Sequence, residues 1–304
     1  MKESIKTKAK KKNITQDRIV YFLNYVFLGL LVIVILYPLI YVLSASFSSG
    51  SALMSGRVRF LPVEFTLDSY KAVFKYDAIW TGYKNSIIYT VVGTVISVAL
   101  TLLAAYPLSR DDFQGRKFFN RIFVFTMIFS GGLVPSFLLI QSLGLMDTMW
   151  AVILPGSVNA FNVIVARTFF KQGIPDELID AAAVDGCSDF KFFTKIALPL
   201  SKAIIAVLAL WIMVGLWNGY FQPMLYINSE EKYPLQLILR RILLLSQVDF
   251  SSSNIDPVQI AKNRHLSEML KYATIIISTL PLMLVYPLVQ KHFVKGVTLG
   301  SVKG

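Results

Sequence analysis

Charged side chains are scarce in this sequence, and their scarcity excludes an ordinary water-soluble domain. Only 16% of the 304 residues are charged, 55% are hydrophobic, and the mean hydropathy is +0.59. A typical soluble domain has about 25% charged residues. The single cysteine, Cys187, also excludes an intramolecular disulfide. A membrane rather than water is therefore expected to be the main solvent of the chain.

Motifs for nucleotide binding and catalysis are missing as well. The sequence contains no GxxxxGK[ST] phosphate loop, no GxGxxG fingerprint and no HExxH zinc motif. Its two histidines, His265 and His292, are not spaced as metal ligands. We therefore expect no catalytic residue, no metal site and no cofactor. If ATP drives the function, the nucleotide must bind to another chain.

Long apolar stretches dominate what is present. A bilayer needs about 20 consecutive apolar residues per helix, because its hydrocarbon core is about 30 Å thick and a helix rises about 1.5 Å per residue. The stretches that meet this requirement are residues 19–43, 85–108, 119–140, 150–170, 201–227 and 267–290. The sequence predicts an all-α integral membrane protein, with a basic N-terminal tail at 1–18, six transmembrane helices within 19–290 and a C-terminal tail at 291–304.

The interiors of the predicted spans carry no Asp, Glu, Lys, Arg or His. Proton-coupled carriers usually need an ionisable relay within the membrane, and voltage sensors need buried arginines. This absence disfavours both classes. A sodium-coupled carrier remains an alternative, because backbone carbonyls can bind the ion, although no internal repeat is evident.

The location of the positive charge favours a membrane topology over a nucleic-acid partner. Lys and Arg of short loops favour the cytoplasmic side. The basic residues of the N-terminal tail are Lys2, Lys6, Lys8, Lys10, Lys11, Lys12 and Arg18. We therefore predict a cytoplasmic N-terminus, and six crossings return the C-terminus to the same side. Nucleic-acid binding by this tail is the disfavoured alternative.

Two features of the predicted spans and loops concern local shape. Prolines inside spans remove a helical hydrogen bond and predict kinks, and they stand at Pro38, Pro135, Pro155, Pro223 and Pro281. Between the last two spans, Leu235, Leu237, Ile238, Ile242 and Leu245 alternate with Arg240 and Arg241 at helical spacing. This pattern predicts an amphipathic helix, either lying on the bilayer or contacting a partner protein.

The segment that joins the fourth and fifth spans, residues 174–200, has the most specific pattern. Pro175 is expected to begin a short helix, Gly186 to supply a left-handed turn, and Ser188 to cap a second helix that Pro199 ends. The small side chains Ala181, Ala182 and Ala183 permit close packing. We expect Ala181 and Ala182 to face a partner, with apolar surface supplied by Phe190, Phe192, Phe193 and Ile196.

This segment resembles the EAAxxxG…P loop of permeases in binding-protein-dependent ABC importers. In that family a Pro follows the Gly by thirteen residues, as Pro199 follows Gly186, with an aromatic residue at the position of Phe193. The usual Glu is Asp180 here. The resemblance implies a six-helix permease fold and a coupling helix that docks on an ATPase subunit. The residues it assigns to coupling are Asp180, Ala181, Ala182, Asp185, Gly186, Phe193 and Pro199.

Further matches are similar to the maltose-type carbohydrate branch of these permeases. Trp217, Asn218 and Pro223 resemble its WNxxxxPL pattern, although Gly219 replaces an acidic residue. Residues 143–155 resemble its third-to-fourth span connection. Residues 293–304 resemble the Gly-rich tail of one permease partner, which assigns Gly296, Gly300 and Gly304 to contact with the ATPase pair.

The resemblance implies a subunit of an oligosaccharide importer in a bacterial cell membrane. The implied partners are a second homologous permease, two ATPase subunits, a solute-binding protein, the sugar and membrane lipid. Complex or uronate-containing oligosaccharides are the nearest substrate class, without a sugar being identified. A permease for another solute is the main alternative, and a membrane sensor would need a signalling domain.

A sugar pathway is hypothesised from polar amides inside the apolar spans. These amides are Asn159, Asn162, Asn218 and Gln222. Buried amides bind sugar hydroxyls or join neighbouring helices, and the sequence alone leaves both roles open.

Overall fold

The computed structural model describes residues 2–245, 268 and 270–287, and within these ranges every regular element is a helix. The prediction of an all-α protein is therefore confirmed. The chain divides into two compact units, Met1–Val73 with Asp249–Ile276, and Phe74–Val248 with Ile277–Gly304.

The first unit contains one long helix followed by a short polar segment. Helix α1, Lys2–Ser46, includes Pro38 without interruption, and its apolar part, Arg18–Ser46, is long enough to cross a membrane. After α1 the chain turns into α2, Gly50–Met54, where the Ser49 hydroxyl caps the helix. The Glu64 carboxylate accepts hydrogen bonds from Ser49, Ser51 and Arg57, which lower its pKa to about 2. Helix α3, Asp68–Lys75, follows this polar segment.

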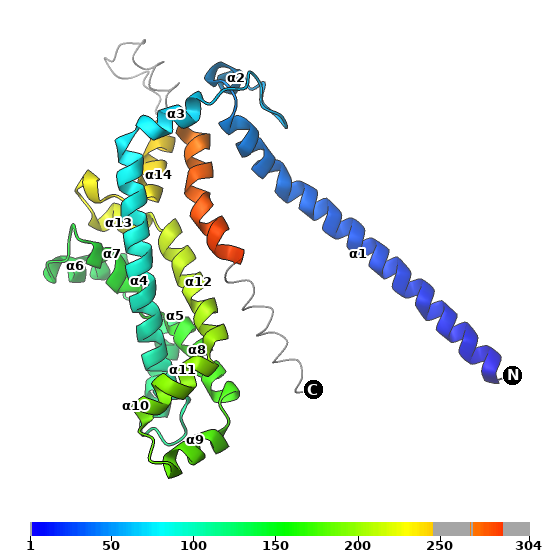
Figure 1. The fold of residues 1–304 in the computed structure, drawn as a ribbon, viewed down its shortest axis with the longest axis vertical. Helices are drawn as coiled ribbons and strands as arrows, with labels where there is room; N and C mark the ends of the chain where they lie inside the picture. The colour runs from blue at the N-terminus through cyan, green and yellow to red at the C-terminus, as the bar shows by residue number, and fades with distance from the viewer. Residues whose placement is uncertain (1, 246–267, 269, 288–304) are drawn as a thin grey trace. The chain divides into compact units, whose positions relative to one another are not determined.

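The second unit is built around α4, Asp77–Ser109, which packs against α8, Ala160–Gly173, α12, Lys202–Asn218, and α14, Leu235–Leu245 (Figure 1). The buried face of α4 consists largely of small side chains at helical spacing. These residues are Gly82, Ser86, Thr90, Gly93, Ser97, Thr101 and Ala105. In a membrane, helices associate where small residues let their backbones approach, because lipid is as apolar as a leucine side chain.

The remaining apolar stretches are broken helices. Three pairs bend sharply at a short break: α5, Arg116–Ile128, with α6, Leu133–Ser142, by 114°; Met149–Gly156 with α8 by 50°; and Asp189–Leu200 with α12 by 80°. Together with α1, α4 and Leu270–Pro287, they give up to six spans by length and composition. The kinks predicted near Pro135 and Pro155 are confirmed, although the first break lies just before Pro135, where the chain contains Gly131 and Gly132.

Two predictions about the second unit need correction. The fifth span does not continue to residue 227, because α12 ends at Asn218 and a separate short helix, α13, Phe221–Tyr226, follows. The predicted amphipathic helix exists as α14, but its apolar face does not lie against the bilayer. Leu235, Leu237, Ile238 and Ile242 are buried, and α14 packs on α4.

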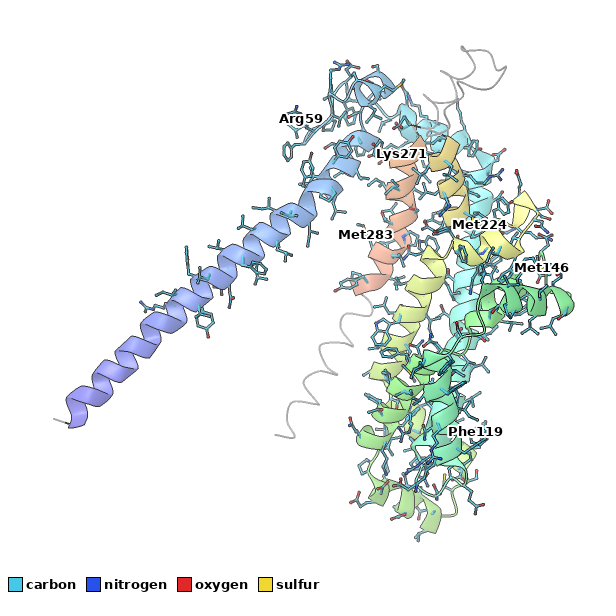
Figure 2. All side chains as sticks on the ribbon, turned by 180° about the vertical axis from the view of Figure 1, so that it is seen from behind. Arg59, Phe119, Met146, Met224, Lys271 and Met283 are labelled. Carbon is cyan, nitrogen blue, oxygen red and sulfur yellow. The ribbon has the colours of Figure 1, made fainter. Side chains whose placement is uncertain are left out.

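Hydrogen bonds hold the chain before α14 against the first turns of α4. Asn85 donates from Nδ2 to the carbonyls of Glu231, at 2.8 Å, and Tyr233, at 3.1 Å. The Tyr89 hydroxyl donates to the Lys232 carbonyl at 2.9 Å, and the backbone N–H of Leu235 donates to the Ser86 hydroxyl at 2.8 Å. These polar groups of an apolar helix are therefore satisfied within the protein. Figure 2 shows Met146 and Met224 toward this end of the unit and Phe119 toward the other.

Gly82 lies at the contact between α4 and α14, and enlarging it tests this packing. A Cβ at residue 82 would overlap the end of Ile238 and lie 3.1 Å from the Leu235 Cα. We predict that Gly82→Val destabilises the protein by about 1 to 3 kcal/mol, as expected for overpacking. Thermal unfolding of the purified complex measures the change. Gly215→Val in α12 is the control, since a Cβ there meets nothing within 4 Å, and equal unfolding temperatures for the two variants would contradict the packing.

Candidate functional site

The segment between α8 and α12 forms an exposed elbow. Helix α9, Asp176–Val184, begins after Pro175, and Gly186 follows it with φ of +71°. The Ser188 hydroxyl then caps α10, Asp189–Phe192, by accepting from the Lys191 N–H. The predicted helix, left-handed glycine and cap are all confirmed. Figure 1 shows α9 and α10 at the end of the second unit where α4 terminates.

The exposed surface of the elbow differs from the predicted one at Ala182. Asp180, Ala181, Asp185 and Gly186 are exposed, and the Val184 side chain is 88% exposed. Ala182 is only 9% exposed, because it packs into the apolar core formed by α4, α8 and α10. The prediction that Ala182 faces a partner is therefore wrong, since this face of α9 holds the elbow on its own chain.

An aromatic cluster anchors the elbow to the end of α4. The Tyr106 ring lies 5.7 Å from the Phe170 ring of α8 and 4.9 Å from the Phe193 ring, measured between centroids. Phe192 and Phe193 are both buried, so they do not supply the predicted apolar surface, and Phe190 alone of the three phenylalanines is exposed, at 71%. A π-helical turn, Phe193–Ala197, follows α10 and leads through α11, Leu198–Leu200, to the bend before α12.

Ion pairs connect the loop after α4 to α5, α8 and α9. Asp111 accepts from the Lys171 ammonium at 2.5 Å and from the Arg116 guanidinium, and Lys171 also lies 3.6 Å from Asp176. The hydrogen bonds from Lys171 and Arg116 hold the pKa of the Asp111 carboxyl below its ordinary value. Sequence reasoning missed this network. Its only sequence signal is a pair of acidic residues, Asp111 and Asp112, within a basic loop.

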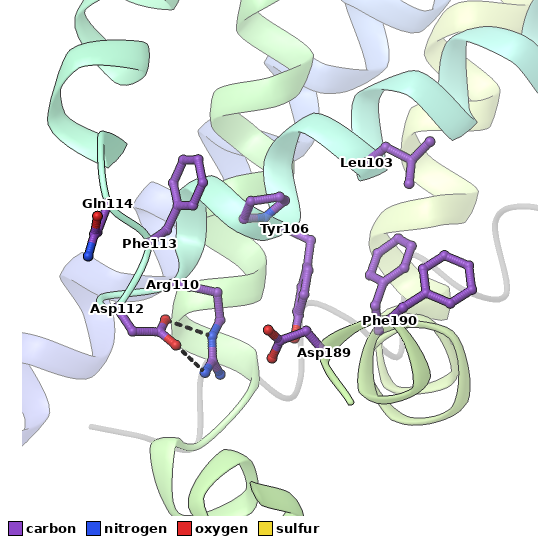
Figure 3. Close-up of a pocket in the computed structure, with 10 residues that line it drawn as sticks. Leu103, Tyr106, Arg110, Asp112, Phe113, Gln114, Asp189 and Phe190 are labelled. Atoms are coloured by element: carbon purple, nitrogen blue, oxygen red, sulfur yellow. Dashed lines mark hydrogen bonds and ion pairs between the residues drawn. The ribbon is translucent and has the colours of Figure 1, made fainter. Parts of the chain in front are cut away.

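A cavity of about 530 Å³ lies beside the elbow, between the end of α4 and α10. Figure 3 shows Arg110 paired with Asp112 on one side of it and Asp189 and Phe190 on the other. The Arg110 Nε and Nη2 atoms donate to the Asp112 carboxylate at 3.2 and 3.1 Å. Because this pair neutralises the guanidinium, the cavity has no free positive charge to attract an anion.

The predicted pathway amides fall into two groups. Asn218 and Gln222 line one pocket of about 290 Å³ at the break between α12 and α13, together with Tyr220. Neither side chain has a hydrogen-bond partner among the described residues. Asn159 instead caps α8 by accepting from the Asn162 N–H at 3.2 Å, so a local structural bond accounts for its position. The tail glycines Gly296, Gly300 and Gly304 lie outside the described residues.

Comparison with known proteins assigns the chain to a family. The family described as "Binding-protein-dependent transport system inner membrane component" matches residues 7–299. The chain belongs to this family. It is therefore a membrane permease component of a binding-protein-dependent transport system.

Individual relatives of this permease cover nearly its full length. It is 42% identical to protein LplC of Bacillus subtilis over 96% of this chain and 97% of that protein. It is also 42% identical to the polygalacturonan/rhamnogalacturonan transport system permease YtcP of the same species, over 95% and 100% of the two chains. A chain in the crystal structure of a bacterial ABC transporter involved in the import of the acidic polysaccharide alginate superposes with a TM-score of 0.82, at 37% identity, covering 91% of the permease and 98% of that chain.

Asp147, which lies away from the elbow in the chain after α6, fixes the chain that follows α13. It has φ of +58°, which Asp tolerates better than most residues. Its carboxylate accepts from the Asn228 and Ser229 N–H groups at 3.0 and 2.9 Å, and from the Ser229 hydroxyl and Lys232 ammonium at 2.6 Å each. These bonds, led by Lys232, lower the pKa of Asp147 far below its ordinary value. In the sequence, Asp147 was noted only as one residue of the segment 143–155, which resembles the connection between the third and fourth spans.

Removing the Asp147 charge should destabilise the permease in a pH-dependent way. A depressed folded-state pKa contributes stability in full above the ordinary value of about 3.9, and this contribution is lost as pH falls below that value. We predict that Asp147→Asn lowers the unfolding temperature by about 2 to 4 °C at pH 7 and pH 5, with a smaller difference at pH 3.5. Scanning fluorimetry of the purified complex measures this.

Glu230→Gln is the matched control for this test, because the Glu230–Arg241 pair lies in the same loop and is exposed. Its effect should be near zero, as is usual for surface pairs. A difference between wild type and Asp147→Asn that is equally large at all three pH values would contradict the assignment of the effect to the carboxylate charge.

Proposed function

We propose that this permease forms half of the oligosaccharide pathway of an ATP-driven importer and couples to the ATPase through residues 174–200. The observation that carries the proposal is the elbow itself. It presents Asp180, Ala181, Asp185 and Gly186 to solvent while Ala182 and Phe193 fix it to the membrane helices. A partner that pushes on α9 therefore moves α4 and α8 with it.

The family implies two of the proposed partners, and the others are our further proposal. A binding protein and an ATPase are implied by a binding-protein-dependent ABC permease. We propose further that a second homologous permease completes the pathway, that two ATPase subunits bind below it, and that the tail residues Gly296, Gly300 and Gly304 contact them. Closure of the ATPase pair would pull the elbows together and bias a two-state opening of the permeases.

The proposed orientation places the elbow and both termini in the cytoplasm. Basic residues near the elbow support it, because Lys and Arg favour the cytoplasmic side. These residues include Arg110, Arg116, Lys117, Arg121, Arg167, Lys171, Lys191, Lys195 and Lys202. The exposed apolar residues of α1 fit contact with lipid or with the second permease.

The oligosaccharide assignment rests on the relatives and on the outer pocket. YtcP is named for polygalacturonan and rhamnogalacturonan, and other relatives at 27–29% identity are named for arabino-oligosaccharides, maltodextrin and galacto-oligosaccharides. Asn218 and Gln222 have no other hydrogen-bond partners within the described part of the chain, so their amide groups are available to sugar hydroxyls.

Two neighbouring alanines provide the sharpest test of coupling. Ala181→Glu places a charge on the exposed face of α9, so we expect normal amounts of permease in the membrane, loss of the ATPase on purification and at least about a tenfold fall in uptake. Ala182→Glu buries a carboxylate in the apolar core, which costs several kcal/mol unless it is paired, so the permease itself should fail to accumulate. Immunoblotting, co-purification and uptake measure these outcomes.

Gly186→Val extends the same test to the left-handed turn. No atom lies within 4 Å of its Cβ position, so any loss comes from φ of +71° rather than from a clash. Full retention of the ATPase and normal uptake in both Ala181→Glu and Gly186→Val would contradict coupling through this elbow.

The amides allow a test of the pathway. We predict that Asn218→Ala and Gln222→Ala each reduce uptake about three- to tenfold at limiting sugar, as expected for one lost hydrogen bond, without lowering the unfolding temperature. Asn159→Ala should instead lower thermal stability, because removing a helix cap costs about 1 kcal/mol. Unchanged uptake in Asn218→Ala and Gln222→Ala at equal expression would exclude both from the pathway.

A further inference from the structure

Arg240 on α14 is a half-buried cation without a carboxylate partner among the described residues. Its Nε atom is buried and has no hydrogen-bond partner there. The neighbouring cations of the same region are paired, since Arg241 lies 2.7 Å from Glu230 and Lys232 lies 2.6 Å from Asp147. An unpaired buried N–H loses its hydration without compensation, so no structural bond among the described residues accounts for the charge of Arg240.

The guanidinium is held in place by an aromatic ring. The Arg240 Cζ lies 4.3 Å from the centroid of the Tyr220 ring, within the range of a cation–π contact. This contact orients the planar guanidinium. It satisfies none of the N–H donors, which point outward in the plane of the guanidinium. Two arginines elsewhere in the unit have polar partners. Arg167 donates to the Leu108 carbonyl at 2.9 Å, and Arg110 pairs with Asp112, although the Arg110 Nη1 atom is also buried without a partner among the described residues.

Tyr220 also lines the pocket that contains Asn218 and Gln222. Arg240 therefore lies one aromatic ring away from a pocket with two free amides. The pocket volume, about 290 Å³, is near the lower limit of about 300 Å³ for small-molecule sites, which suits one unit of a longer chain rather than a whole oligosaccharide. Amides suit sugar hydroxyls, whereas a guanidinium suits a carboxylate.

We propose that Arg240, Tyr220 and the Asn218–Gln222 pocket form a subsite for an acidic sugar, with Arg240 binding the carboxylate of a uronate unit. This proposal rests on the proposed import of oligosaccharides and specifies their chemical class. A guanidinium offers forked donors that match both carboxylate oxygens, and such charge-assisted bonds are the stronger ones. A neutral sugar hydroxyl can accept a hydrogen bond from the guanidinium but leaves its charge unpaired, so the site favours an acid. The alginate and polygalacturonan systems of the relatives agree with this chemistry.

The test uses the complete importer with its binding protein in proteoliposomes. Tetragalacturonate and tetramannuronate are the acidic probes, and galactotetraose is the neutral probe. Arg240→Gln removes the positive charge, and Arg240→Lys keeps the charge without the forked guanidinium donors. Arg241→Gln is the matched control, because it removes the adjacent, exposed and already paired arginine. Uptake at limiting probe and ATP hydrolysis stimulated by the loaded binding protein are measured for each variant.

We expect wild type to import at least one acidic probe. Arg240→Gln should lose at least about tenfold of that uptake, as for a lost hydrogen bond to a charged group, with stimulated ATP hydrolysis within about twofold of wild type. Arg240→Lys should recover part of the loss, and raised salt should narrow the difference between Arg240→Lys and Arg240→Gln. Arg241→Gln should stay within about twofold of wild type.

Each other outcome overturns the proposal in a distinguishable way. Acidic uptake within twofold of wild type in Arg240→Gln excludes the subsite. Equal losses of uptake and of stimulated hydrolysis would place Arg240 in docking of the binding protein or in folding, as would a loss in Arg240→Lys as large as in Arg240→Gln. Import of galactotetraose alone by wild type would reject the acidic class but keep the proposed function. Import of none of the three probes would remove the oligosaccharide assignment itself.

Discussion

The close approach of helices along the small-residue face of α4 is the constraint on which the second unit depends. Lipid offers an apolar side chain as favourable an environment as a protein interior does, so hydrophobicity alone cannot select one helix neighbour over another. Close contact between helix backbones can select the neighbour. Glycine, serine, threonine and alanine at successive turns of α4 let α8, α12 and α14 approach together, and Gly93 leaves room for Leu216 and Ile153. Larger buried residues also occur on α4, and among them Tyr89 and Tyr106 find specific partners.

The same helix carries both candidate sites. At its start, Asn85, Ser86 and Tyr89 bind the chain that leads into α14 and Arg240. At its end, Tyr106 and the ion pairs of the following loop hold the elbow. A helix of 33 residues is about 50 Å long at about 1.5 Å per residue. Because a single continuous helix is stiff over this length, a displacement at the elbow reaches the start of α4 as a tilt or shift of the whole helix, without a relay of small rearrangements.

Much of this architecture was predictable, and the failures have physical causes. Apolar length identified the spans, and the positions of Pro175, Gly186 and Ser188 identified the elbow, because turns and caps depend on a residue's own chemistry. The sequence could not show which side of α9 faces inward, since three consecutive alanines do not distinguish a polar side from an apolar one. The environment of α14 was misjudged because an apolar face suits lipid and α4 equally well. The sequence did not distinguish Arg240 from Arg241, since their different pairing among the described residues arises only from the fold.

The π-helical turn at Phe193–Ala197 constrains the length of the chain as well as its composition. Successive residues of an α-helix point about 100° apart, yet the adjacent Phe192 and Phe193 are both buried, at the point where the wider turn begins. The wider turn holds about one residue more than an α-helical turn, so deleting one residue within it would restore regular winding and leave everything from α11 onward facing as before. Deleting one residue of α10, outside this turn, would instead rotate the elbow relative to α11 and α12 by about 100°. Evolution of this segment is therefore expected to tolerate a change of length within the turn and to proceed by exchange of residues elsewhere.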